Sequence, residues 1–425
     1  MKRAVVVGSG AGGAAVASGL ADRFSVAVLE AGRDFRPFGA GLRTVDAFKR
    51  AGLLLDVREI GLMFPAMKAF KAREGMVLVK GRGTGGTTTI AAGNALRLDR
   101  DLRELGIDLN DEFAALEREV PITTAHRSRW SRTTRALFDA MEEMRLEPRV
   151  MPKMGRYEDC AMCGRCVLGC PQGVKWDSRA LLARAVERGV TLRTRVTAER
   201  VVVKGGEALG LEVRAGRRRE FVPADLVVLA AGGFGTPPLL ARSGIPCEPR
   251  LFVDPVLCVT ATWKGARQDR DLPMPFYVQK DGYILSPYFD HLSYFFNRDW
   301  RPPAGDILSL MIKLADEPAG GADGRRVSKP LTGADTARLA EAAGLCREVF
   351  GRLGVRADDL VFGTLNAGHP GGSLPLRPET AASLHDPRLP ENLYVADATL
   401  FPRALGAPPI LTIMALARKV ARVCV

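Results

Sequence analysis

Four cysteines stand close together in one short segment of this 425-residue chain. They are Cys160, Cys163, Cys166 and Cys170, and Pro171 follows the last of them, which gives the spacing C-x2-C-x2-C-x3-C-P. Bacterial ferredoxins have this spacing, and their closely spaced thiolates bind iron–sulfur clusters. We therefore predict that the four cysteines bind an iron–sulfur cluster, with a 4Fe–4S cluster favoured over a 3Fe–4S cluster.

The same segment allows other interpretations. A remote cysteine such as Cys247 or Cys258 could replace Cys170 as the fourth ligand, and three ligands alone would indicate a 3Fe–4S cluster. A zinc ion could use the four thiolates, although zinc ligand pairs are usually separated by a longer spacer. The segment could also be inherited without a metal. A disulfide framework is disfavoured, because the other four of the eight cysteines are scattered among apolar neighbours.

The first thirty residues place a glycine-rich turn between two predicted strands, Ala4–Val7 and Ser25–Glu30, with an alanine-rich helix reaching about Ala21. Three glycines occupy the spacing G-x-G-x-x-G, namely Gly8, Gly10 and Gly13. The first permits a tight turn, the second lets a pyrophosphate approach, and the third lets the helix pack on the strand. The pattern predicts a dinucleotide-binding Rossmann unit in which Glu30 accepts hydrogen bonds from the adenosine ribose.

The type of dinucleotide follows from the rest of the sequence. The chain carries one such fingerprint, whereas flavin reductases that use pyridine nucleotides usually carry a second, so we predict FAD as the cofactor. The other glycine-rich stretch, Lys80–Thr87, lacks the lysine that follows the last glycine of a P-loop. An ATPase is therefore disfavoured.

Further motifs resemble those of the glucose–methanol–choline (GMC) oxidoreductases, FAD enzymes that oxidise alcohols. They follow one another in the family's order, and they are Glu30–Gly32, Gly81–Thr88 with Asn94, Asp225–Pro237, Asn392–Pro402 and Leu411–Ala417. Together they cover most of the predicted FAD-binding region. The resemblance implies an FAD-dependent oxidoreductase that acts on CH–OH donors.

The resemblance also implies which residues contact the cofactor. Asp397 would bind the ribityl chain or a hydroxyl near the phosphates. Thr412 would begin a helix whose N-terminus faces the pyrimidine end of the flavin and stabilises its anionic reduced form. The full predicted set is Gly8, Gly10, Gly13, Glu30, Arg82, Gly85, Gly86, Asn94, Val196, Ala231, Gly232, Asp397 and Thr412.

One histidine has the context of a catalytic residue. Asn366–Ser373 resembles the family segment that carries the catalytic histidine, so His369 is predicted to take the hydroxyl proton while hydride passes to flavin N5. The family's second histidine or asparagine falls on Pro408, whose side chain forms no hydrogen bond. The other histidines, His126, His291 and His385, lack such a context and are interpreted as surface or capping residues.

The elements around these motifs predict an α/β fold (α+β overall), with a Rossmann-type FAD-binding domain and a smaller antiparallel-sheet substrate domain. The FAD-binding domain is expected to be discontinuous, over 1–100, 177–250 and 366–425. A helical insertion ending in the cysteines is expected over 101–176, and the substrate or cap domain over 251–365. Within the latter we expect strands at Tyr283–Phe289 and His291–Phe296 and a helix at Asp335–Leu353.

The net charge of +13 bears on the partners of the protein. It favours an acidic electron-acceptor protein or partner subunit besides a small-molecule substrate. No basic run is interleaved with aromatic residues, so we expect no nucleic acid. Ala4–Ala21 is uncharged but consists mainly of Gly, Ala and Ser, so we expect neither a secretory signal nor a transmembrane segment, and a cytoplasmic protein.

Two functions remain open at this level. The first is an FAD-dependent dehydrogenase that moves hydride from a CH–OH substrate to flavin N5 and passes the electrons on through the iron–sulfur cluster. The alternative is a flavin and iron–sulfur electron-transfer subunit of a larger redox complex, which the proline at position 408 favours.

Overall fold

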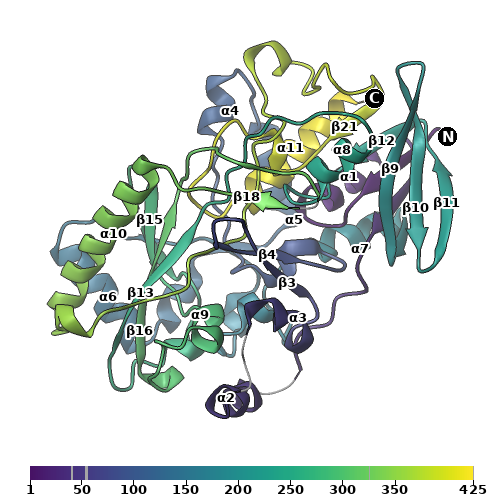
Figure 1. Ribbon diagram of the computed structural model, residues 1–425. Helices are drawn as coiled ribbons and strands as arrows, with labels where there is room; N and C mark the ends of the chain where they lie inside the picture. Colours follow the sequence, from purple (N-terminus) through teal and green to yellow (C-terminus); the bar gives the residue numbers. More distant parts are fainter. Residues whose placement is uncertain (40–41, 53–55, 325, 425) are drawn as a thin grey trace.

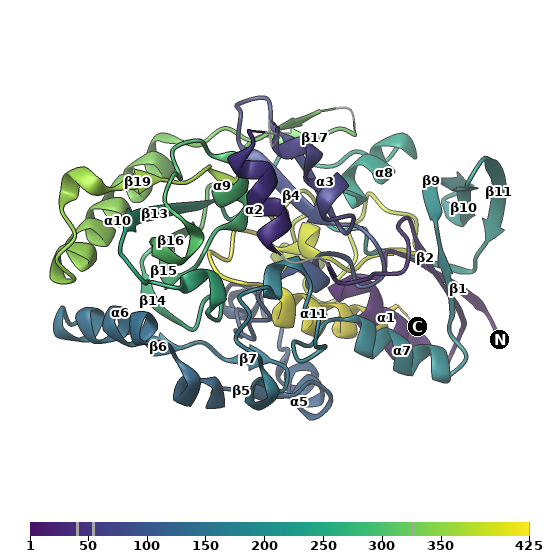
Figure 2. The ribbon, with the colours of Figure 1, turned by 90° about the horizontal axis from the view of Figure 1, so that it is seen from below.

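The computed structural model describes residues 1–39, 42–52, 56–324 and 326–424. Two sheets lie toward opposite ends of the molecule, and both chain termini lie at the end that carries the parallel sheet (Figures 1 and 2). The predicted α/β fold is confirmed. The ranges predicted for the separate domains stay a prediction, and residues 40–41, 53–55, 325 and 425 of those ranges lie outside the described residues.

The parallel sheet contains the predicted Rossmann unit. Across the described residues its order is β21 (Leu393–Val395), β12 (Leu226–Leu229), β1 (Arg3–Val7), β2 (Ser25–Glu30) and β8 (Thr191–Thr194). Val5 pairs with Val227 on one side and with Ala27 on the other, so the central strand is buried on both faces. Such strands are continuous apolar runs, as the sequence of β1 and β12 shows.

Helices and a second small sheet surround the parallel sheet. The helices at this end are α1 (Ala11–Leu20), α4 (Arg100–Glu104), α5 (Asn110–Glu119), α7 (Arg179–Glu187), α8 (Thr236–Arg242) and α11 (Ile410–Val423). Helix α1 packs against α7 and α11, and α11 packs in turn against α5 (Figure 2). Strands β9 (Val196–Lys204) and β10 (Glu207–Ala215) form an antiparallel hairpin, and β11 (Arg218–Pro223) extends it.

The second main sheet is mostly antiparallel. Within the described part of the chain its order is β3 (Met67–Lys71), β4 (Val77–Gly81), β20 (Asn366–Ala367), β13 (Val256–Thr262), β16 (Ile307–Leu314), β15 (Tyr283–Pro287), β14 (Phe276–Lys280) and β6 (Arg149–Val150), with β19 (Val361–Phe362) also paired to β13. The long helix α10 (Gly333–Arg352) and helix α6 (Arg132–Glu143) cover one face. Strands β3, β4, β6 and β20 come from outside 251–365, so this sheet crosses the predicted domain limits.

The remaining elements are short. They are α2 (Leu42–Arg50), α3 (Ile60–Met63), α9 (His291–Phe296), the pair β5 (Ile122–Thr123) and β7 (Lys153–Met154), and the pair β17 (Gly321–Ala322) and β18 (Val327–Ser328). The strand predicted over His291–Phe296 is wrong, because this segment is helix α9. The Asp290 side chain accepts a hydrogen bond from the backbone N–H of Leu292 (3.0 Å), which caps a helix at that point. No helix of the described residues is long and apolar enough to cross a membrane.

Candidate functional site

The glycines of the first turn bring three backbone segments close together. Gly8 has φ +102°, and a side chain there would lie 2.4 Å from the carbonyl oxygen of Ala230 at the end of β12. A side chain at Gly13 would lie 1.9 Å from the carbonyl oxygen of Gly8. Only glycine therefore lets α1 approach β1 and β12 this closely, as the fingerprint predicts.

A second glycine-rich loop, Gly81–Thr88, lies directly against this turn. A side chain at Gly86 would lie 3.0 Å from the Cα of Gly10, and Gly85 has φ +86°. The backbone N–H of Gly85 donates to the hydroxyl of Ser9 (3.2 Å). Two glycine-rich turns thus face each other, and helix α1 begins directly after the first of them, at Ala11. The N–H groups of a first helical turn have no intrahelical partner and can bind a phosphate.

Glu30 ends β2 beside these turns. Its carboxylate accepts hydrogen bonds from the hydroxyl of Ser9 (2.6 Å), from the N–H of Ser9 (3.3 Å) and from the N–H of Gly32 (2.7 Å). A carboxylate has about four acceptor positions. One position is therefore left for a ligand hydroxyl, which is compatible with the predicted ribose contact.

Asp397 is more fully occupied. It accepts bonds from the N–H of Gly232 (2.8 Å), the hydroxyl of Thr236 (2.5 Å), and the N–H (3.0 Å) and hydroxyl (2.6 Å) of Thr399. Burial raises the pKa of this carboxyl, against the lowering effect of these bonds. Asp397 thus ties the turn after β12, with Ala231 and Gly232, to the end of β21, and its predicted bond to a cofactor hydroxyl stays a prediction.

The other predicted cofactor residues take up different positions. The hydroxyl of Thr412, the third residue of α11, accepts a bond from the N–H of Leu98 (2.9 Å). Asn94 accepts a bond from the ammonium of Lys153 (2.5 Å). Arg82 is exposed in the second glycine loop, and Val196 is buried where β9 begins.

A large cavity opens beside the antiparallel sheet, whose strands β4, β13 and β16 contribute wall residues, and it reaches the start of α11 at Ile410. It has a volume of about 1060 Å³ including its open mouth, and His369, Pro408 and Asn94 lie in its wall. Its apolar wall residues are Ile60, Phe64, Met67, Val79, Ile90, Val167, Leu168, Val256, Met274, Leu292, Phe295, Met311 and Ile410. We call this space the catalytic cavity. It brings the predicted base together with the proline that stands in the second catalytic position.

His369 is held by a buried carboxylate that the sequence motifs did not reveal. Its Nδ1 lies 3.3 Å from Oδ2 of Asp254, which is itself 3.6 Å from the ammonium of Lys313. Asp254 precedes β13 and Lys313 lies in β16. Because an ionised carboxylate only accepts hydrogen bonds, Nδ1 carries the proton and Nε2 has a free lone pair. Burial and Lys313 lower the pKa of His369, and Asp254 opposes this shift.

The prediction that the remaining histidines are surface or capping residues is wrong for two of them. His126 is fully buried, with Nε2 2.8 Å from the carbonyl oxygen of Met151 and Nδ1 accepting from Trp130 (3.1 Å). His291 is 5% exposed, lies in the wall of the catalytic cavity, and has Nε2 3.2 Å from the carbonyl oxygen of Gly164. Their burial depends on distant segments. His385 is partly exposed, as predicted.

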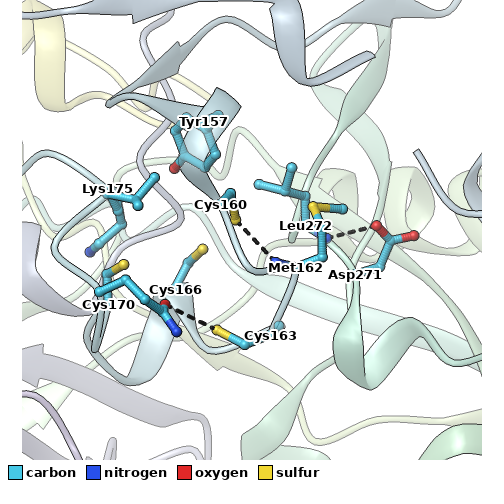
Figure 3. A pocket seen from close by; sticks show the side chains of 12 residues that line it. Tyr157, Cys160, Met162, Cys163, Cys166, Cys170, Lys175, Asp271 and Leu272 are labelled. Atoms are coloured by element: carbon cyan, nitrogen blue, oxygen red, sulfur yellow. Dashed lines mark hydrogen bonds between the residues drawn. The ribbon is translucent and has the colours of Figure 1, made fainter. Parts of the chain in front are cut away.

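The four clustered cysteines line a second, smaller pocket, which we call the cysteine pocket; its volume is about 310 Å³ when the open space at its mouth is included. Figure 3 shows their side chains around one shared space, with Tyr157 and Lys175 on the same side of it. Cys160 and Cys166 are buried, whereas Cys163 and Cys170 are partly exposed. All eight cysteines of the chain are free thiols. Burial raises the pKa of Cys166 to about 12.

The spacing of these cysteines bears on the kind of metal. Among the residues that the structure describes, no three His, Cys, Asp or Glu side chains converge as ligands of a single metal ion. One tetrahedral zinc would require sulfurs about 4 Å apart, from Zn–S bonds of about 2.3 Å. A multi-iron cluster is larger and needs a wider ring of thiolates. The iron–sulfur cluster stays a prediction.

Two buried lysines connect the cysteine pocket to the second glycine loop. The ammonium of Lys175 donates to the carbonyl oxygens of Thr88 (3.0 Å), Thr89 (2.8 Å) and Ala91 (2.9 Å). That of Lys153 donates to the side-chain oxygen of Asn94 and to the carbonyl oxygens of Ala92 (3.2 Å) and Pro273 (2.6 Å). All these acceptors are neutral. Burial lowers the pKa of both lysines, that of Lys153 to about 7.

The two cavities share one wall. Val167 and Leu168 follow Cys166 in the short helical turn Cys166–Leu168 and line the catalytic cavity, while Cys166 and Cys170 line the cysteine pocket. The loop of the cysteines is thus also part of the wall around the predicted base. Sequence spacing alone did not indicate this proximity, because His369 lies some two hundred residues further along the chain.

Comparisons with known proteins agree with this geometry. The chain is 25% identical to an uncharacterized protein of Methanocaldococcus jannaschii, over 98% of both chains. It is 31% identical to an uncharacterized GMC-type oxidoreductase of Mycobacterium tuberculosis, over 58% of this chain and 40% of that protein. The crystal structure of pyridoxine 4-oxidase from Mesorbium loti has the same fold, with a TM-score of 0.72, 17% identity and 99% coverage of both chains. The family model described as GMC oxidoreductase matches residues 3–256, and the chain belongs to this family of FAD-binding oxidoreductases.

Proposed function

We propose that this oxidoreductase is a dehydrogenase of a hydroxyl-bearing small molecule, and that its electrons leave through an iron–sulfur cluster bound by Cys160, Cys163, Cys166 and Cys170. The observation that carries the proposal is the shared wall. The residues between Cys166 and Cys170 line the cavity that contains His369. An electron outlet at the cysteines would therefore begin next to the site of substrate oxidation.

The residues present fit FAD. Side chains at Gly8, Gly13 and Gly86 would collide with neighbouring backbone, so the two facing turns form a cradle that is open only because glycines occupy it. The turns would hold the pyrophosphate, and Glu30 would hold the ribose with its remaining acceptor position. FAD supplies the hydride acceptor of the reaction.

His369 is the proposed base. With Nδ1–H donated to Asp254, its Nε2 accepts the proton of the substrate hydroxyl as hydride leaves the adjacent carbon. The imidazolium that forms is stabilised by the Asp254 carboxylate, whose charge the neighbouring Lys313 partly offsets. Pro408 cannot bind the hydroxyl, so its orientation depends on His369 and on the shape of the largely apolar wall.

The charges around the cysteine pocket support an anionic occupant. Lys153 is 0% exposed and Lys175 is 3% exposed, and their hydrogen-bond acceptors are neutral oxygens. Asp177 acts on Lys175 as a negative charge, whereas no carboxylate is among the groups that shift the pKa of Lys153. A buried ammonium group without a negative partner is costly. Metal binding deprotonates thiols, so a thiolate-ligated cluster would supply the missing negative charge. Bound there by the cysteine thiolates, an iron–sulfur cluster would supply a one-electron outlet toward an external acceptor protein.

The experiment is anaerobic purification followed by quantification of flavin and iron and by EPR spectroscopy before and after addition of a panel of alcohols. The proposal expects flavin, about four irons per chain, and an EPR signal that appears when an alcohol is added. Flavin without iron would refute the outlet and leave a simple alcohol dehydrogenase or oxidase. Failure of every alcohol, with reduction by a partner protein instead, would favour the electron-transfer subunit that Pro408 also allows.

A further inference from the structure

Tyr157 lies in the wall of the cysteine pocket and is fully buried. Its hydroxyl has no nitrogen or oxygen partner among the described residues. Tyr157 lies beside the cysteines (Figure 3), and three of them, Cys160, Cys166 and Cys170, interact with its hydroxyl. A tyrosine hydroxyl is protonated at neutral pH, so Tyr157 presents a hydrogen-bond donor to a group of sulfur atoms.

An unpaired buried hydroxyl needs a physical reason. Leaving such a donor without a partner costs free energy, whereas phenylalanine would fill the same space without that cost. The surroundings also leave room for the oxygen, because a side chain at Gly93 would lie 2.6 Å from it. Two other side-chain acceptors line the pocket, but Asp271 accepts a hydrogen bond from the hydroxyl of Thr134 (2.5 Å) and Gln172 accepts one from the thiol of Cys163 (3.8 Å). The cysteine sulfurs, and whatever they bind, are therefore the acceptors that we consider for this hydroxyl.

We propose that Tyr157 donates a hydrogen bond to a sulfur of the metal centre, at Cys166 or at a sulfide next to it, and thereby raises the reduction potential of that centre. This inference rests on the proposed function. A hydrogen bond to a sulfur ligand stabilises the more negative, reduced state of a cluster. The buried ammonium groups of Lys153 and Lys175 act in the same direction, because they too stabilise added negative charge.

The consequence is a direction for electron flow. A centre with a raised potential accepts electrons more readily from the reduced cofactor in the neighbouring cavity. The ammonium groups of Lys175 and Lys153 donate hydrogen bonds to the segment Thr88–Asn94, part of which lines that cavity. The Tyr157 hydroxyl and the two lysines therefore act on the same side of the molecule. Tyr157 is therefore a positioning and tuning residue of the outlet, and it takes no part in proton abstraction from the substrate.

The test is a redox titration of the intact, iron-loaded protein monitored by EPR, for the wild type and for Tyr157→Phe. The variant should keep its iron and have a lower midpoint potential. At the midpoint potential of the wild type, the ratio of oxidised to reduced metal centre should be about tenfold higher in the variant, which corresponds to a shift of about 59 mV for one electron. Tyr283→Phe is the matched control. Its buried hydroxyl donates to Glu341 (2.9 Å), away from the cysteine pocket, and its loss should leave the potential unchanged.

A second variant covers the case in which Tyr157→Phe fails to bind iron. Site-specific replacement of Tyr157 by 3,5-difluorotyrosine keeps the hydroxyl and strengthens it as a donor, so the midpoint potential should rise. Equal potentials in wild type and variants would overturn the role of Tyr157 and leave the iron–sulfur outlet standing. A wild-type protein without iron would overturn both proposals.

Discussion

The two cofactor regions of this protein differ in how their own polar groups are paired. Around the glycine turns, Glu30 and Asp397 are bonded almost completely by the protein, and the open space is produced by the absence of side chains. Around the cysteine pocket, the hydroxyl of Tyr157 has no nitrogen or oxygen partner among the described residues, and the ammonium groups of Lys153 and Lys175 donate to neutral oxygens. The first region is defined by its shape, and the second by its buried donors and charges.

This difference implies that the two regions depend on their cofactors to different degrees. A site that is shaped by glycine can keep its structure without a ligand, because its hydrogen bonds are already made. A pocket with two buried positive charges gains stability when a negative group enters it. The four predictions below separate the regions, in order from the largest expected effect to the smallest.

Replacing Cys166 by serine should abolish iron binding and leave flavin binding intact, because serine supplies no thiolate and the glycines Gly8, Gly13 and Gly86 pack against other backbone segments. Iron and flavin contents of the purified variant measure both effects. Cys247→Ser is the control, since Cys247 lies outside the pocket lining. Loss of iron from Cys247→Ser would show that a remote cysteine is a ligand.

Replacing His369 by alanine should reduce the rate of flavin reduction by substrate about 10²- to 10⁴-fold, the usual contribution of a general base. Flavin and iron contents should be unchanged, which distinguishes loss of chemistry from loss of either cofactor. Stopped-flow absorbance under anaerobic conditions measures the rate. His385→Ala is the control: His385 is not among the residues that line the catalytic cavity, so this substitution should leave the rate unchanged. An unchanged rate in His369→Ala would remove His369 from the mechanism.

Replacing Gly13 by alanine should destabilise the parallel-sheet end by about 3 kcal/mol and reduce its flavin content, because the new Cβ would lie 1.9 Å from a backbone oxygen. Iron content should change less than flavin content. Gly344→Ala is the matched control in the middle of α10, where a side chain meets nothing and should stabilise the helix by about 1 kcal/mol. Urea unfolding measures both, and equal losses of iron and flavin in Gly13→Ala would contradict the separation of the regions.

Replacing Asp254 by asparagine should have the smallest effect, a reduction of the maximal rate by about tenfold, since His369 keeps a hydrogen-bond partner but loses a stabilising charge. The base works in its neutral form, so activity rises with pH through the pKa of His369. Asp254 raises this pKa, and its removal lowers it further below the usual value. The acidic limb of the pH–rate profile should therefore move to lower pH, and a move to higher pH would contradict the assigned role.

Local patterns predicted much of this molecule. The strands β1 and β12 are short, mainly apolar runs that are followed by glycine or alanine, and the parallel pairing of β1 with β2 follows from helix α1 between them. The glycine spacing predicted a turn that the Gly13 contact explains. In both cases the residues that determine the structure are neighbours in sequence.

The rest depends on contacts between distant segments. Asp254 contacts His369, which lies 115 positions away in the sequence, and Lys313, which lies 59 positions away. Neither Asp254 nor Lys313 belongs to a recognisable sequence motif. Helix α9 was predicted as a strand because its aromatic residues are typical of strands, whereas the cap at Asp290 starts a helix. The burial of Tyr157 and Lys153 could not be predicted from the sequence, because it depends on the packing of distant residues against the segment Thr88–Asn94.

The wall formed by Val167 and Leu168 has a consequence for how the products of a turnover are separated. Its side chains carry no groups that can relay a proton, and it directly follows Cys166 in the chain. Electrons can tunnel through such a layer, whereas protons need a chain of hydrogen-bonded carriers. The proton and the electrons that are removed from the substrate would thus separate at this wall. The proton would stay with His369 and return to water through the mouth of the catalytic cavity. The electrons would leave on the other side of the wall, through the cysteine pocket.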